Sequence, residues 1–269
     1  MGCNRPPFPE PERTCQHPSM TTADVRPATR PLTAADLDWV LDLIEPRRRQ
    51  LAEQAPHFWN PAPGARALHG RFLGGQIADP HLVTLRTDHG FVFAGPRGDG
   101  FVIDDFLVDS DDRWPTDGAA LVRDAVADRS VRIVCPVHEL GRYRLAKDLG
   151  LTVAESWWTH DLVSGAAVEP DGAQFPSDRQ LPGDGLISVE GTSGRLLPAP
   201  PVYAPGGPVL ILSRIAAPES LAAAEQQAGA AGATVAVVPQ RADDLSRAQL
   251  LSAAGYRRTT DYYDGVPVG

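Results

Sequence analysis

The sequence has few of the residues and runs that mark several large classes of protein. Its 269 residues include three cysteines, Cys3, Cys15 and Cys135, and their positions give neither a disulfide framework nor zinc-ligand spacing. No apolar run is long enough to cross a bilayer, and the N-terminus lacks the charged-then-apolar pattern of a secretion signal. We therefore expect a cytoplasmic protein without a metal and without a membrane partner.

Positive charge is also scarce. Lys and Arg number 25 against 34 Asp and Glu, and the resulting net charge of -9 argues against a nucleic-acid partner. No glycine-rich turn follows the first strand of an α/β unit, as a dinucleotide-binding protein would need. Hydrophobic residues make up 42% and charged residues 22%, which is typical of a globular chain long enough for two domains.

The order of helical and strand patterns indicates an α/β protein with a mixed sheet. A Pro-rich tail over 1–24 precedes a first domain over 25–163, in which Thr33 and Asp36 form a capping-box pattern and Pro46 ends or kinks the first helix. Apolar spacing predicts helices over 37–46, 47–55, 65–73, 116–127 and 139–149, and strands over 81–87, 90–94, 100–109, 131–135 and 152–159.

The second half of the chain repeats the end of the first. After a linker or irregular crossover over 164–200, residues 201–269 give strand, helix, strand, helix, strand in the same order. The segment 145–158 (LAKDLGLTVAESWW) matches 250–263 (LLSAAGYRRTTDYY), with the helix-ending Gly150 opposite Gly255. The correspondence favours a duplication, although any two strand–helix–strand units look partly alike.

One segment, Asp104–Ala119, combines an apolar strand, an arginine and a helix start with small residues. A helix starting at Thr116 or Asp117 has free N–H groups at its first turn, and Gly118 would let a phosphate approach the backbone. Arg113 can add a charge-assisted hydrogen bond. This order of residues predicts an anion site suited to a diphosphate.

Here the sequence resembles the GNAT acyltransferase superfamily. The family's acetyl-CoA motif is Arg or Gln, two residues, Gly, one residue, then Gly or Ala, and Arg113, Thr116 and Gly118 fall on those places, with Val108 five residues earlier. The resemblance covers 25–162 and, more faintly, 201–264. It implies a tandem GNAT-like fold whose second copy is degenerate, because Ser213–Ser220 lacks both the motif and paired carboxylates. The FWNP and WW segments resemble an actinobacterial subgroup.

The resemblance also implies how a cofactor and a catalytic base would be held. Acetyl-CoA or another acyl-CoA would lie along the strand and the following loop, and an acidic residue of the strand would act as base. The expected cofactor contacts are Phe106, Leu107, Val108, Arg113, Trp114, Pro115, Thr116, Asp117, Gly118 and Ala119. Asp105 is preferred over Asp104 as base, since strand alternation sends only one of them into the cleft. The alternative is that one or both carboxylates lie on an exposed or bulged edge and have no catalytic role.

Two departures from the family pattern qualify this expectation. Thr116 replaces the middle glycine, and Ala146 stands where the family often has a general-acid tyrosine, so that Tyr143, one turn earlier, is the substitute candidate. Phe58 and Trp59 could contact the acceptor, a small-molecule or peptide amine, or belong to the core. The predicted function is acyl-CoA-dependent N-acyl transfer; the alternative is an inactive acyl-CoA-binding protein.

Overall fold

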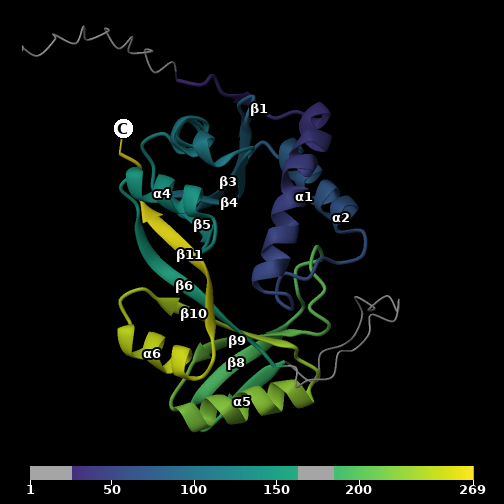
Figure 1. Cartoon of the computed structure of the whole chain (residues 1–269), viewed down its shortest axis with the longest axis vertical. Helices are drawn as coiled ribbons and strands as arrows, with labels where there is room; N and C mark the ends of the chain where they lie inside the picture. Colours follow the sequence, from purple (N-terminus) through teal and green to yellow (C-terminus); the bar gives the residue numbers. More distant parts are fainter. Residues whose placement is uncertain (1–25, 163–184, 269) are drawn as a thin grey trace, which may run out of the picture.

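A computed structural model of the chain describes residues 26–162 and 185–268 (Figure 1). The expected tail over 1–24 and the first part of the expected linker lie outside the described residues. The described chain forms two units joined through one large mixed sheet. Its class, α/β with a mixed sheet, is the predicted one.

The first unit is built from strands and α-helices between Arg30 and Asp161. They are β1 (Arg30–Pro31), α1 (Leu37–Gln54), α2 (Ala65–Ala78), β2 (Val83–Arg86), β3 (Gly90–Arg97), β4 (Gly100–Val108), α3 (Ala119–Val126), β5 (Val131–Pro136), α4 (Leu140–Asp148) and β6 (Thr152–Asp161). The prediction that Pro46 ends or kinks the first helix and that a second follows from Arg47 is wrong in one respect: α1 continues through Pro46 to Gln54.

The second unit is β7 (Leu186–Val189), β8 (Thr192–Leu197), β9 (Val209–Arg214), α5 (Pro218–Ala230), β10 (Val235–Arg241), α6 (Leu245–Ala253) and β11 (Arg257–Gly265). The linker expected over 164–200 is therefore wrong for 186–197. Glu190 and Gly191 both have positive φ, 44° and 84°, which suits the tight turn of a two-residue hairpin. Ile187 and Leu196 point into the core from the two strands, so this hairpin folds despite its Gly-rich and Ser-rich composition.

The two units exchange their last strands. The strand order is β1-β2-β3-β4-β5-β11-β6-β10-β9-β8-β7. Hence β11, from the second unit, lies between β5 and β6 of the first, while β6 lies between β11 and β10 of the second. From β2 to β7 the order has a pseudo-two-fold symmetry with β11 and β6 at its centre, where Figure 1 shows them side by side. This symmetry supports the predicted duplication.

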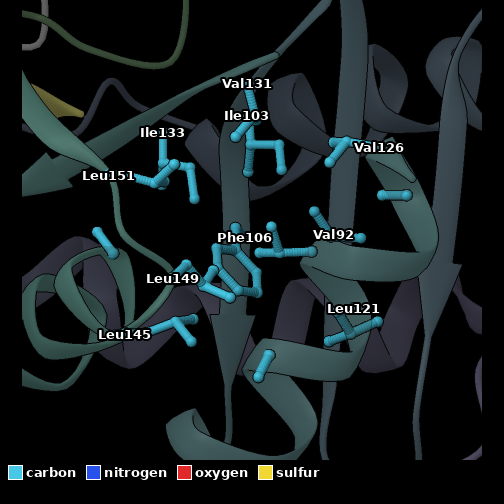
Figure 2. Close-up of a cluster of buried hydrophobic side chains, with 14 of the residues drawn as sticks. Val92, Ile103, Phe106, Leu121, Val126, Val131, Ile133, Leu145, Leu149 and Leu151 are labelled. Atoms are coloured by element: carbon cyan, nitrogen blue, oxygen red, sulfur yellow. The ribbon is translucent and has the colours of Figure 1, made fainter. Parts of the chain in front are cut away.

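Helices cover both faces of the first unit's strands. On one face, α1 and α2 pack their apolar residues against Phe91 and Phe93. On the other face, α3 and α4 cover a cluster that includes Ile103, Phe106 and Ile133, drawn in Figure 2. Because Phe106 is fully buried at the centre of this cluster, the backbone of β4 is held firmly just where the candidate site begins.

Candidate functional site

The parallel strands β4 and β5 pair for only a short distance. Their register runs from Phe101 opposite Val131 to Ile103 opposite Ile133, and beyond that point the pairing stops. A cavity of about 500 Å³ lies where the chain continues past the strands; its walls are one side of α1, the end of β4 with the turn 109–111, Trp114, and the start of α4. We call this cavity the donor cleft.

A β-bulge interrupts β4 just before the donor cleft. Val92 pairs with Phe106 and Ala94 with Ile103, so that Asp104 and Asp105 together oppose Phe93 alone. A bulge redirects side chains relative to simple alternation. The expectation that only one of the two carboxylates faces a cavity is wrong, because both line a second, smaller cavity of about 110 Å³ beside Phe93. We call it the recess.

Asp105 is tied to a histidine and an arginine that come from the two N-terminal helices. Nε2 of His69, on α2, lies 3.4 Å from Oδ2 of Asp105, and Nδ1 of His69 lies 3.0 Å from NH2 of Arg48, on α1. Arginine can only donate, so Nδ1 must accept and the ring proton sits on Nε2, facing Asp105. Burial opposes ionisation of Asp105, but the His69 hydrogen bond and nearby positive charges outweigh it and lower its pKa.

Asp104 has a different environment although it is the adjacent residue. Its side chain reaches solvent through the recess, and among the described residues no group donates a hydrogen bond to its carboxylate. The dense protein surroundings and the negative charge of Asp105 raise the pKa of Asp104, against the opposing charges of Arg47, Arg142 and His69. The pKa values of these two neighbouring carboxyls are shifted in opposite directions. Such a difference is expected where one carboxyl acts as a base and the other supports it.

A buried arginine bridges the gap where β4 and β5 separate. Arg142 of α4 is fully buried, and its guanidinium donates to the carbonyl of Phe106 on β4 and to that of Val134 on β5. Its Nε lies 2.9 Å from Glu139, whose other oxygen lies 2.5 Å from Nε of Arg47. Burial opposes the charge of Glu139, but the two arginines lower its pKa. This Arg47–Glu139–Arg142 triad stands in for the missing strand-to-strand bonds.

The predicted diphosphate loop is not a free helix start. Helical structure begins at Asp111 with a 3₁₀ turn, continues through a π-helical turn over Trp114–Gly118, and runs on into α3. The amide of Ala119 already bonds to carbonyls of Thr116 and Trp114. The expected helix start at Thr116 or Asp117 is therefore wrong, and the amide of Ala119 is not free, because the helix starts about five residues earlier than its small residues suggest.

Apart from Trp114, the residues of that loop from Arg113 to Ala119 do not line the donor cleft. Trp114 is buried with its ring edge-on to Phe106, and its indole lies so close to Gly141 that a side chain there would clash. Arg113 faces Asp117 at 3.9 Å, and Asp117 itself is buried. Among the predicted cofactor contacts, those in the wall of the donor cleft are Leu107, Val108 and Trp114; Phe106, Arg113, Pro115, Thr116, Asp117, Gly118 and Ala119 are outside it.

The predicted acceptor contacts belong to the junction between the units. Phe58 is buried against Val209, Val235 and Val237 of the second unit, and Trp59 packs edge-on to Tyr203 at 5.1 Å. The side chain of Asn60 donates to the carbonyl of Ala204. Phe58 and Trp59 therefore belong to the core, which was the alternative to acceptor contact. Neither residue lines the donor cleft or the recess.

Tyr143, the predicted substitute acid, lies in neither cavity. Its ring packs edge-on to that of Tyr263 on β11, with the centroids 5.7 Å apart, and Lys147 lies over its face. The residues that sequence reasoning missed are Arg47, Arg48, His69, Glu139 and Arg142. A signal existed for two of them, because Glu139-x-x-Arg142 recurs as Asp244-x-x-Arg247 at the matching place of the repeat.

Comparisons with known proteins bear on the fold. No protein-family model and no curated protein matches the chain. Among solved structures, a Thermoplasma acidophilum protein described as an acetyltransferase aligns with a TM-score of 0.52 and 12% identity, over 89% of this chain and 99% of its own. The chain has the GNAT fold. A GCN5-related N-acetyltransferase from Sphaerobacter thermophilus aligns over 90% of this chain and 96% of its own, with a TM-score of 0.51 and 12% identity.

In residues 26–162 and 185–268, no group of three or more His, Cys, Asp and Glu side chains could hold a metal ion. The helices of the same ranges are all too short or too polar to cross a membrane.

Proposed function

We propose that the chain is an acyl-CoA-dependent N-acyltransferase whose first unit carries the site. The observation that carries this proposal is the cavity at the separated ends of β4 and β5, directly after a bulge that presents Asp104 and Asp105. The GNAT fold supports it, and both cavities are lined by β4, the donor cleft by Leu107 and Val108 and the recess by Asp104 and Asp105. The predicted acetyl group is one of several acyl groups that the cleft could accept.

The walls of the donor cleft fit only part of such a donor. A neutral, amide-containing arm suits the mixture of Leu107, Val108, Gln50 and backbone groups. A diphosphate would instead meet five carboxylates, against one arginine that is already paired with Glu139 and one histidine. We therefore place the acyl thioester end in the donor cleft and leave the diphosphate outside it. The five are Asp42, Glu53, Asp109, Asp111 and Glu139.

In this proposal the residues of the bulge remove a proton from the acceptor amine. An alkyl amine has a pKa of roughly 10 and must lose a proton before it attacks a thioester carbonyl. Asp104, with its raised pKa and access to solvent, is the base, and Asp105 holds His69 rather than acting itself. This reverses the predicted preference for Asp105. Once the amine nitrogen has bonded to the acyl carbon, the thiolate of the donor leaves and takes up a proton.

A second candidate function has its own supporting observation. Arg142 and Trp114 fill the space between β4, α3 and α4, which favours a chain that keeps the GNAT fold but transfers nothing. The two candidates differ in one measurement. The enzyme releases free thiol from an acyl-CoA when an amine is present, and the inactive protein releases none at any amine concentration.

The decisive experiment combines that assay with donor binding. Acyl-CoAs of increasing chain length are titrated calorimetrically against the full chain, and thiol release is followed with a panel of amines. Gln50→Trp should fill the donor cleft and weaken donor binding at least tenfold, whereas Gln226→Trp, the same change on an exposed position of α5, should not. Equal donor affinity in both variants, or no thiol release from any donor, would refute the proposal.

A further inference from the structure

The recess beside the β4 bulge has walls that match one chemical group. Its polar residues are Asp104, Asp105 and Gln76, and two phenylalanines, Phe72 and Phe93, contribute its aromatic side. We infer that the recess binds the ammonium group of the acceptor, and that this acceptor is an alkylamine with no acid group beside its amine. The inference rests on the proposed function and specifies the substrate class.

Three of the side chains that line the recess bring acceptor oxygens to it. Besides the two carboxylates, Oε1 of Gln76 is shielded from solvent and receives no hydrogen bond from any described residue. A shielded acceptor without a donor destabilises the folded chain, and a bound donor removes that cost. A primary ammonium brings three N–H donors and a positive charge, so it can satisfy Gln76 and a carboxylate together.

Among the described charged groups around the bulge, one carboxylate lacks a partner and could bind one cation. Asp105 already receives the proton-bearing nitrogen of His69, and Arg47 is bound to Glu139. Arg142 is likewise held by Glu139 and by two carbonyl oxygens. Asp104 is the negative group of the recess without a hydrogen-bond donor in the described chain. A single ammonium would therefore complete the charge pairing at the bulge.

The aromatic side and the size of the recess restrict the rest of the ligand. Phe72 is 56% exposed, which is unusual for a phenylalanine in a packed domain, and its ring lies beside that of His69. A ring face at this place attracts a cation and covers the first methylene groups of an alkyl chain. A volume of about 110 Å³ holds an ammonium with a few carbons. The remainder of the molecule must extend into solvent.

Two adjacent carboxylates exclude acceptors that carry their own acid group close to the nitrogen. In an α-amino acid the carboxylate lies two bonds from the nitrogen, and it would come close to Asp104 and Asp105 whenever the ammonium is bound. Like charges at such distances repel strongly where solvent is partly excluded. The recess therefore distinguishes alkylamines from amino acids by charge.

Binding is tested on the full chain without any acyl donor. Propylamine and glycine, both with one primary ammonium at neutral pH, are titrated at equal ionic strength while the ring resonances of Phe72 are followed by NMR. Saturable binding is expected for propylamine, with at least tenfold weaker binding for glycine. Asp104→Asn should weaken propylamine binding at least tenfold and Phe72→Leu severalfold, while Asp128→Asn, at an exposed aspartate elsewhere, should change nothing.

The outcomes separate this inference from the proposed function. Equal affinity for glycine and propylamine, or propylamine binding unchanged in Asp104→Asn, refutes the inferred ammonium site even if acyl transfer occurs. If propylamine binds as expected but is never acylated by any acyl-CoA, the proposed function is refuted and the inferred ammonium site is kept. Circular dichroism of each variant shows that it is folded before its affinity is compared.

Discussion

Oγ of Ser156 donates a 2.7 Å hydrogen bond to Oδ1 of Asp261, and the two residues occupy equivalent positions of the repeated segment. They pair directly opposite each other on β6 and β11, so the pseudo-two-fold axis of the chain passes between them. Asp261 is buried and also receives the guanidinium of Arg258. The polar contact at the centre of the sheet therefore joins the two exchanged strands.

Asp261→Ala is expected to destabilise the whole chain by about 1–3 kcal/mol, because it leaves the hydroxyl of buried Ser156 without its acceptor and removes the partner of the partly exposed Arg258. Ser156→Ala should cost about 1–2 kcal/mol, since Arg258 still satisfies the carboxylate. Urea denaturation measures both changes. Asp243→Ala, which removes an exposed pair with Arg241, is the control and should leave the stability unchanged. A loss from Asp261→Ala no larger than the control's would contradict this view of the contact.

Strand exchange also predicts that the units unfold together. Removal of β11 would expose edges of both β5 and β6, which belong to the first unit. Hydrogen exchange at increasing urea should therefore show β4 and β9 losing protection in one transition. Two separate transitions, one for each half, would mean that the exchanged strands do not couple the units.

Much of the fold was predictable because its signals are local. The capping box of Thr33 and Asp36 forms as expected, and Gly150 and Gly255 end their helices with φ of 76° and 84°. The exchange of β6 and β11 could not be predicted, since strand partners distant in sequence are not specified by either strand alone. The β7–β8 hairpin was missed because its short strands lie in a segment whose composition is typical of loops.

The candidate site was predictable only where its residues lie on one strand. Two adjacent carboxylates within an apolar strand are unusual, and this drew attention to Asp104 and Asp105. Arg48 and His69 are 21 residues apart in the sequence and lie on two different helices. Nothing in this spacing indicates that their side chains meet. The helix start was misplaced because Gly118 looks like a loop residue, whereas here it provides close packing against Trp114.

Arg142 is expected to be essential for the stability of the first unit. Arg142→Ala removes the donors to Phe106 and Val134 from a buried position and should cost about 3 kcal/mol or more. Arg142→Lys keeps the charge but cannot bridge two carbonyls and Glu139 at once, so it should recover only part of the loss. Urea denaturation with Arg144→Ala, an exposed neighbour on α4, as control measures these differences. Full stability of Arg142→Ala would show that the bridge is dispensable.

We expect the ionisation of Asp104 to set the acid limb of the pH–rate profile for acyl transfer. A base is active when deprotonated, so a raised pKa of Asp104 means that kcat/KM rises with pH through a range above that of an ordinary aspartate. Asp104→Asn should remove this limb and lower kcat/KM by about 10²–10⁴. A pH–rate profile of each variant measures it. An unchanged limb in Asp104→Asn would assign the titration to another group.

Arg48 and His69 should act on the same profile without contacting the acceptor. Arg48→Met removes the donor that fixes the proton of His69 on Nε2, so Asp105 loses part of its hydrogen bond and its pKa should rise. The acid limb should then shift, with little change in the KM of the amine. His69→Gln, whose amide can still donate to Asp105, should partly retain the wild-type profile. Identical profiles in all three proteins would exclude this positioning role.

Cys135 gives a direct measure of unfolding. Burial in the core raises the pKa of its thiol to about 12, above the value of roughly 8.5 of a free cysteine. Below pH 8.5 the thiol is neutral in both states and this group costs no stability; as the pH rises from there toward 12, only the unfolded chain ionises, so stability falls. In a Cys3→Ser, Cys15→Ser background, a thiol reagent at pH 8 should react with native protein at least a hundredfold more slowly than with protein in urea. Slow reaction is expected because Cys135 is packed in the first unit's core, and fast reaction of the folded chain would show instead that β5 opens locally.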